Sequence, residues 1–242
     1  MSLLAFEEID ARHGLLQAVR SVTLQVAEGE TVALVGANGA GKTTLLRTIA
    51  GAHRPTGGRI VFDGRDITKV APHRRVAMGI TLVPEGRRLF SELTVEENLL
   101  VARVRGRRGP WTVDAVIDAF PMLGPLRKKR ARTLSGGEQQ ATAIGRGLMT
   151  NPRLLLLDEL SLGLAPVAVD GAYRSLESLI ERGTTILLVE QDLSRAMKVS
   201  DRIVCMLEGR FVLEGKVTEL TREQVTEAYF GLRRPAPNGS TP

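Results

Sequence analysis

Nine residues near the N-terminus have the types and the spacing of a loop that holds phosphate groups. The pattern G-x-x-x-x-G-K-[ST] is matched in turn by Gly36, Ala37, Asn38, Gly39, Ala40, Gly41, Lys42 and Thr43, and Thr44 follows. Glycines let backbone N–H groups close around an anion, and a helix start adds partial positive charge. The Lys42 ammonium would contact the β- and γ-phosphates of a nucleotide, and the Thr43 hydroxyl would hold Mg²⁺.

The sequence on either side of this loop has the context that such a site requires. Residues 31–35 form an apolar run that predicts a strand, and residues 43–50 have the texture of a helix. The alternative is a glycine-rich turn that binds nothing. The full spacing, the lysine and the strand–loop–helix order favour the phosphate site.

Two adjacent carboxylates follow a second apolar run, residues 154–157. Such a run predicts a strand buried on both faces of a parallel sheet, so Asp158 and Glu159 would emerge at its carboxyl end, where ligands bind. Asp158 is placed to hold Mg²⁺ through the water shell of the ion. Glu159 is the better candidate for polarising the water that attacks the γ-phosphate. A strand that merely stops at two solvated acids is disfavoured downstream of a phosphate loop.

A third motif, LSGGEQQ at residues 134–140, lies about a hundred residues after the loop. It resembles the signature sequence of ATP-binding cassette (ABC) ATPases, and few other proteins carry both motifs in this order. From about residue 3 to residue 232, the chain resembles the nucleotide-binding subunit of an ABC transporter. The resemblance implies ATP as the nucleotide, Mg²⁺ as its metal ion, and ATP hydrolysis coupled to transport across a membrane.

Longer strings narrow the resemblance to the ATP-binding subunits of branched-chain amino acid importers. These strings are VPEGRRLF at 83–90, LTVEENL at 93–99, SLGLAP at 161–166 and VEQ at 189–191. Glu85 stands where most ABC proteins have a glutamine that contacts the metal and the attacking water. Gln191 stands where most have a histidine that senses the γ-phosphate. Both replacements resemble the branched-chain subgroup, and an amide can donate a hydrogen bond to phosphate but cannot carry a titrating proton.

Two other positions depart from the family pattern. His13, ahead of Gly14, stands where the family places an aromatic ring against adenine, and its smaller ring implies a weaker contact with the base. A lone histidine at such a position is also commonly a surface or turn residue, so that alternative stays open. Leu160 stands where a proline usually follows the catalytic glutamate, and the sequence offers no reason for it.

The resemblance also implies partners. In the family, two subunits pack head to tail, and the signature of each covers the nucleotide on the other. Here Ser135, Gly136, Gly137 and Glu138 would act on the ATP of a homologous subunit, which is either a second copy or a related chain. Ser135 and two glycine N–H groups at a helix start would form a second anion site. Two membrane permeases and, indirectly, an extracytoplasmic binding protein would complete the importer and hold this chain at the cytoplasmic face of the inner membrane.

Three other functions agree less well with the sequence. A urea or short-chain amide importer is the nearest alternative, although glutamine would be expected there in place of Glu85. A soluble ABC ATPase that acts on ribosomes or nucleic acid usually has two cassettes or a long coiled-coil insertion, and the sequence has neither. A P-loop kinase or GTPase is disfavoured by the signature and by the absence of an Asn-Lys-x-Asp motif.

Composition agrees with a cytoplasmic ATPase. The single cysteine, Cys205, excludes an internal disulfide and is expected to be a small buried apolar residue. The N-terminus does not resemble a signal peptide, and no run of about eighteen apolar residues could span a bilayer. The net charge of +6 comes with basic clusters at 103–108, 127–130 and 233–234. Aromatic residues make up only 4% and none interleaves with these clusters, so a face toward anionic lipid is favoured over nucleic acid.

The predicted fold is an α/β P-loop NTPase core of the ABC type. It has a mixed, mainly parallel sheet, an N-terminal antiparallel β-region and a helical signature subdomain. We predict one domain over residues 1–232, with the helical subdomain at about 92–150 and a disordered tail at 233–242. Strands are also expected at 3–9, 22–26, 59–62, 80–83, 185–189 and 202–207. Helices are expected at 94–104, after the capping box Thr94-x-x-Glu97, and at 113–120, with a break at 106–110.

Overall fold

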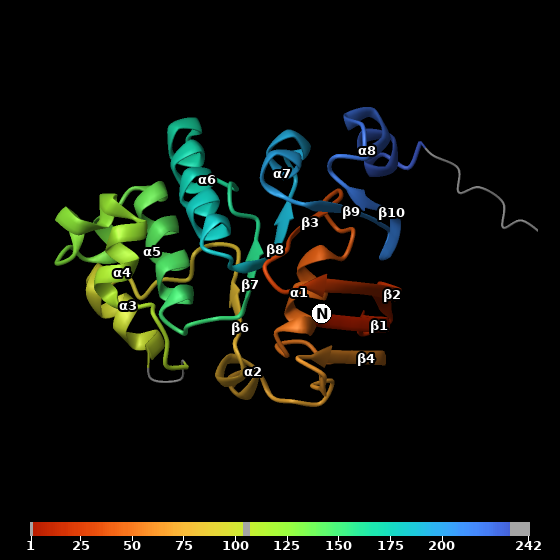
Figure 1. Ribbon diagram of the computed structural model, residues 1–242, viewed down its shortest axis with the longest axis horizontal. Helices are drawn as coiled ribbons and strands as arrows, with labels where there is room; N and C mark the ends of the chain where they lie inside the picture. Colours follow the sequence, from red (N-terminus) through yellow and green to blue (C-terminus); the bar gives the residue numbers. More distant parts are fainter. Residues whose placement is uncertain (1, 104–106, 233–242) are drawn as a thin grey trace, which may run out of the picture.

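The computed structural model describes residues 2–103 and 107–232, whose strands form two sheets (Figure 1). The first sheet is antiparallel, in the order β2-β1-β4-β5. Its strands are β1 (Ser2–His13), β2 (Leu16–Ala27), β4 (Gly57–Phe62) and β5 (Arg65–Asp66). The predicted N-terminal antiparallel β-region is therefore confirmed.

The second sheet is parallel except at one edge, in the order β10-β9-β3-β8-β7-β6. Its parallel strands are β3 (Thr31–Val35), β6 (Ile80–Val83), β7 (Leu154–Asp158), β8 (Thr185–Glu190) and β9 (Arg202–Leu207), and β10 (Arg210–Lys216) is the antiparallel edge strand. Every residue of β3, β7 and β8 is buried, as continuous apolar runs predict for the centre of a parallel sheet.

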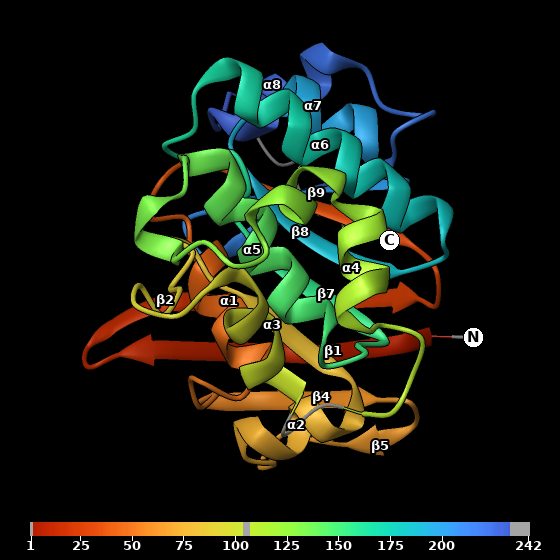
Figure 2. The ribbon, with the colours of Figure 1, turned by 90° about the vertical axis from the view of Figure 1, so that its left-hand side faces the viewer.

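The helix α1 (Lys42–Ile49) lies between the two sheets (Figures 1 and 2). Leu45, Leu46 and Ile49 of this helix share one hydrophobic cluster with residues of both sheets. Packing on two sides fixes the axis of α1, so its first turn is held rigidly at the carboxyl end of β3. This is the strand–loop–helix unit that the sequence predicts.

Helices occupy the described residues between β6 and β7, and they lie to one side of the sheet (Figure 1). They are α3 (Val95–Arg103), α4 (Val113–Ala119) and α5 (Gly136–Leu148), with 3-10 turns at Pro121–Leu126 and Ala131–Thr133. Thr94 and Glu97 form the predicted capping box, in which the Thr94 N–H donates to Glu97 Oε2 at 2.8 Å and the Glu97 N–H to Thr94 Oγ1 at 3.2 Å. Residues 104–106, where the predicted helix end and the start of the break fall, lie outside the described residues.

Some elements differ from the sequence prediction. The strands β1 and β2 extend to His13 and Leu16, well beyond the predicted 3–9 and 22–26, because pairing continues through register irregularities to the hairpin turn. No element was assigned to α2 (Pro72–Met78), α6 (Pro166–Glu181), α7 (Leu193–Val199) or α8 (Arg222–Tyr229). The tail predicted at 233–242 lies outside the described residues. Within residues 2–103 and 107–232, no helix has both the length and the apolar character needed to cross a bilayer.

Candidate nucleotide site

The loop between β3 and α1 has a backbone that only glycine can adopt at several positions. Gly36 and Gly41 have φ angles of +154° and +106°, and a Cβ on them would collide with the carbonyl oxygens of Met206 and Ala18, respectively. Gly39 also has a positive φ, +82°, but no atom lies within 4 Å of an added Cβ. Gly36 and Gly41 therefore let the loop pack closely, and Gly39 borders open space that a phosphate can enter.

Lys42 lies at the start of α1 and is only 4% exposed. Its Nζ donates hydrogen bonds to the carbonyl oxygens of Gly36, at 2.7 Å, and Ala37, at 2.9 Å. An ammonium has three donors, so one remains for a phosphate oxygen. Burial lowers the pKa of Lys42, against the opposing charges of Glu159 and Asp158. An anion beside this ammonium would relieve the cost of burying it.

Asp158 and Thr43 form a place that fits Mg²⁺. The Thr43 hydroxyl donates to Asp158 Oδ1 at 3.0 Å, while Asp158 Oδ2 is buried and has no hydrogen-bond partner among the described residues. Burial raises the pKa of Asp158, and the hydrogen bond from Thr43 opposes that shift. A cation would satisfy the orphaned oxygen. No group of three or more His, Cys, Asp or Glu side chains in the described part could hold a metal alone, so phosphate oxygens would complete the coordination, as is common for Mg²⁺.

Glu159 has an unusual backbone conformation for a residue with a side chain. Its φ is +52°, in the left-handed region, and its N–H donates to the Val189 carbonyl at 3.1 Å. Non-glycine residues in this region store strain, which is found preferentially at functional sites. The conformation turns the chain sharply at the end of β7, and the half-buried Glu159 lines the same hollow as the phosphate loop.

A hollow of about 430 Å³ brings most of the predicted residues together. Its lining includes His13, Asn38, Gly39, Gly41, Lys42, Thr43, Thr44, Glu85, Glu159 and Gln191. Leu16, Ala18 and Leu162 also line it, although the sequence analysis did not single them out. Of the remaining predicted residues, Gly36, Ala37, Ala40 and Asp158 are not among the lining residues, and Ala40 packs in the core.

The four signature residues do not line this hollow. Ser135 caps α5 instead, and its N–H donates to Glu138 Oε2 at 2.7 Å while its Oγ accepts from the Glu138 N–H at 3.4 Å. The sequence analysis missed this capping box, although its Ser-x-x-Glu spacing is the one recognised at Thr94. The signature therefore begins a helix, as predicted, and its residues lie outside the hollow formed by the phosphate loop of its own chain.

Comparison with known proteins agrees with this geometry. A family model described as "ABC transporter" matches residues 19–161. The chain belongs to the ABC transporter family. It is 42% identical to the high-affinity branched-chain amino acid transport ATP-binding protein BraG of Pseudomonas aeruginosa, over 95% of this chain and 100% of that one.

Two further similar proteins are also named as ATP-binding components of transporters. LivF of Archaeoglobus fulgidus, named a probable branched-chain amino acid transport ATP-binding protein, is 35% identical over 91% of this chain and 94% of its own. Among solved structures, the ADP conformation of MJ1267, an ATP-binding cassette of an ABC transporter, superimposes with a TM-score of 0.81. That structure is 29% identical and covers 96% of this chain and 99% of its own.

His13 of this ABC protein lies at the end of β1 and is exposed at the edge of the hollow. Its Nε2 is 3.1 Å from the hydroxyl oxygen of Thr44, and its ring lies 4.5 Å from the ring of His53, tilted by 43°. The ring is thus held between α1 and the segment after it, beside the phosphate loop.

Leu160, which the sequence could not explain, has a structural reason in this ABC protein. The side chain is 1% exposed and belongs to the cluster that joins β7, α5 and α6. The leucine therefore contributes its whole side chain to the hydrophobic core at this position. Cys205 is fully buried on β9, as predicted, and burial raises the pKa of its thiol to about 12.

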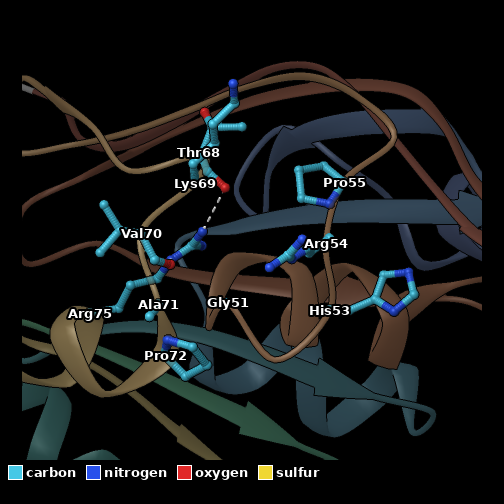
Figure 3. A pocket seen from close by; sticks show the side chains of 10 residues that line it. All are labelled: Gly51, His53, Arg54, Pro55, Thr68, Lys69, Val70, Ala71, Pro72 and Arg75. Carbon is cyan, nitrogen blue, oxygen red and sulfur yellow. Dashed lines mark hydrogen bonds between the residues drawn. The ribbon is translucent and has the colours of Figure 1, made fainter.

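A second hollow, of about 450 Å³, lies near the C-terminal end of α1 and is lined by Arg54, Lys69 and Arg75 (Figure 3). Arg75 is 1% exposed. Its guanidinium donates to five backbone carbonyls, those of Thr48, Ile49, Ile67, Thr68 and Val70. Every donor of this arginine is thus used to join α2 to the end of α1 and to the segment at 67–70, so Arg75 stabilises the fold and has no donor left for a ligand.

Proposed function

We propose that this chain is the ATP-binding and ATP-hydrolysing subunit of an ABC importer for branched-chain amino acids. The observation that carries the proposal is the single hollow that joins the phosphate loop, Glu159 and Gln191. A nucleotide triphosphate in that hollow would place its γ-phosphate near a carboxylate that can orient water and an amide that can donate to a phosphate oxygen.

The residues have distinct roles in this proposal. Lys42 and the loop N–H groups bind the phosphates, while Thr43, Asp158 and Glu85 hold Mg²⁺ directly or through water. Glu159 orients the attacking water, Gln191 contacts the γ-phosphate, and the His13 ring lies against adenine. The bound ion supplies charge that stabilises the transferring phosphoryl group.

The transported substrate and the partners rest on the relatives. BraG and LivF are both named for branched-chain amino acid transport, and each aligns with nearly all of this chain. The position of Ser135 outside the hollow supports a head-to-tail pair, in which Ser135, Gly136, Gly137 and Glu138 act on the nucleotide of a homologous subunit. Two permeases would hold that pair at the cytoplasmic face of the membrane, and an extracytoplasmic binding protein would deliver the amino acid.

The direct test is the rate of Mg-ATP hydrolysis by the Glu159→Gln variant. Loss of the general base should slow turnover by about 10²–10⁴-fold while ATP still binds. Glu181→Gln is the matched control, because Glu181 is an exposed glutamate at the end of α6, away from the hollow. Near-normal turnover of the Glu159 variant would remove this residue from the proposed role. Uptake of labelled leucine and of urea, with and without this chain, distinguishes the two import functions.

A further inference from the structure

Glu190 is a buried carboxylate for which the proposed function has no role so far. It is the last residue of β8, directly before Gln191, and it is 1% exposed. Its Oε1 accepts a hydrogen bond from the Ser161 N–H at 3.2 Å. Its Oε2 accepts from the Ser161 hydroxyl at 3.1 Å and from the Gln191 N–H at 3.1 Å.

The two bonds from Ser161 join segments that leave neighbouring strands at the same edge of the sheet, and the bond from Gln191 is local to its own segment. Ser161 lies three residues beyond Asp158, the last residue of β7, and Gln191 directly follows the last residue of β8. A backbone hydrogen bond, from the Glu159 N–H to the Val189 carbonyl at 3.1 Å, also connects these strand ends. Both Glu159 and Gln191 line the hollow, so the carboxylate of Glu190 lies directly behind the two residues proposed to act on the γ-phosphate.

The chemistry of Glu190 suits this position. A carboxylate only accepts hydrogen bonds, and two backbone N–H groups and a hydroxyl converge on it. A buried carboxylate without donors would be costly, so the three donors and the charge hold one another in place. Tyr173 of α6 lies nearby, and burial followed by the charge of Glu190 raises the pKa of Tyr173.

We propose that Glu190 is a positioning residue for ATP hydrolysis. It ties the segment of Glu159 and Ser161 to Gln191, so that the carboxylate that orients water and the amide that contacts phosphate keep a fixed separation. The inference rests on the proposed function, because it assigns Glu190 a part in the reaction of that same hollow. Glu190 itself does not line the hollow and is not expected to touch the nucleotide.

The isosteric variant Glu190→Gln separates this role from simple burial. A glutamine has one accepting oxygen, so its NH₂ group must face either the Ser161 N–H or the Gln191 N–H, and one backbone bond is lost. Ser161→Ala removes only the hydroxyl bond and leaves both backbone bonds in place. Thr185→Val is the matched control: Thr185 is also buried on β8, at the opposite end, where its hydroxyl accepts from the Gly29 N–H at 2.8 Å.

The measurements are kcat for ATP hydrolysis and Kd for Mg-ATP, taken well below each melting temperature. Glu190→Gln should lower kcat by about 10–100-fold, the effect of a small misplacement of reacting groups, with Kd within about twofold of wild type. Ser161→Ala should lower kcat by about 2–10-fold, as the loss of one hydrogen bond does. The double variant should be less impaired than the product of the two factors, because both changes weaken the same link between the two strand ends. Thr185→Val should lower the melting temperature and leave kcat unchanged.

Three results would overturn the inference. One is a kcat for Glu190→Gln equal to that of Thr185→Val, and another is a loss of ATP affinity that accounts for the whole loss of activity. If Glu190→Gln does not fold, an unchanged kcat in Ser161→Ala decides against it. A wild-type protein that does not hydrolyse ATP contradicts the proposed function first, which is a distinct outcome.

Discussion

Lys42 and Asp158 show how the candidate site works against the stability of the ligand-free fold. Burial lowers the pKa of Lys42 and raises the pKa of Asp158, so each charged form is disfavoured where it lies. One oxygen of Asp158 has no partner among the described residues. Groups kept in this state are commonly retained for function, because a ligand of opposite charge relieves the cost that the fold alone has to bear.

Asp158→Asn should therefore stabilise the ligand-free protein. Because the folded-state pKa of Asp158 lies above its ordinary value, the unfolded chain releases this proton first, and the stability that the group contributes falls as pH rises through that window. At pH 7.5 the variant should melt a few degrees above wild type, since 1 kcal/mol corresponds to about 2–4 °C in a chain of this size. The difference should shrink as pH is lowered toward the carboxyl pKa. A lower melting temperature for Asp158→Asn than for wild type at pH 7.5 would contradict this expectation. Mg-ATP should raise the melting temperature of Asp158→Asn less than that of wild type.

The role of His13 can be tested by changing the size of its ring. If the ring faces adenine, His13→Ala should weaken ATP binding by at most about tenfold, because ring stacking contributes about 0.5–1.5 kcal/mol. His13→Tyr should bind as tightly as wild type or more tightly, since a larger ring covers more of the base. The measurement is the ATP affinity of wild type, His13→Ala and His13→Tyr at a fixed Mg²⁺ concentration. If tyrosine binds worse than alanine, the ring does not lie against the base.

Among the elements, α5 packs closely against α3 and α4 of the helical region. A Cβ on Gly145 would lie 2.6 Å from Val116 Cγ1 of α4 and 3.0 Å from Leu99 Cδ2 of α3. Both are apolar atoms of buried side chains, and Val116 is stiff because it is branched at Cβ. The missing side chain at Gly145 is therefore what lets three helices approach one another.

Gly145→Ala should destabilise the protein by about 1–3 kcal/mol through overpacking, in spite of the better helix propensity of alanine. Gly171→Ala is the matched control, because Gly171 lies within α6 and nothing is found within 4 Å of an added Cβ. That variant should gain about 0.5–1 kcal/mol, the usual difference between glycine and alanine in a helix. Urea unfolding of the two variants compares them directly, and an equal effect at both positions would show that packing does not decide the outcome.

The sequence predicted those elements whose local pattern is complete. The strands at 80–83 and 202–207 have the predicted bounds, since Gly79 and Pro84 limit the first strand and Asp201 and Glu208 limit the second. The helix α6 was missed, although Val169, Ala172, Tyr173, Leu176 and Leu179 have helical spacing and are all buried. The hairpin end at His13 could not be predicted, because it depends on pairing with residues that come later in the chain.

The candidate site likewise contains residues that motifs predict and residues that only the fold brings together. The phosphate loop, Asp158 and Glu159 follow from motifs, which record residue types at fixed spacing. Leu16 lies in no motif, and Glu190 falls in the VEQ string only as the neighbour of Gln191, so only the meeting of distant segments shows what these two residues contact. Ser161 joins Glu190 across 29 positions of the chain. Such contacts are set by the order of strands in the sheet, which a local pattern does not contain.

At the scale of the whole molecule, part of the basic charge is used within the fold. Arg127 pairs with Glu96 at 2.6 Å and with Asp114 at 3.1 Å, and Arg130 lies 3.5 Å from Glu92. The cluster at 127–130 thus joins segments of the helical region, which leaves less free positive charge there for either nucleic acid or anionic lipid. The clusters at 103–108 and 233–234 fall partly or wholly outside the described residues.

At the same scale, the signature does not cover the nucleotide hollow of its own chain within the described residues, because Ser135 does not line that hollow. With Mg-ATP, the Glu159→Gln variant should therefore associate with a homologous ATPase subunit, or with a second copy, and stay associated because hydrolysis is blocked. Adding Ser135→Leu should abolish the association by filling the anion site at the start of α5. Thr112→Leu is the control, because Thr112 caps α4 through the Ala115 N–H at 3.2 Å and its loss costs about the same 1 kcal/mol of helix capping. Light scattering measures the mass in each case. Equal association by the Ser135 and Thr112 variants would show that the signature does not contact the nucleotide of a partner.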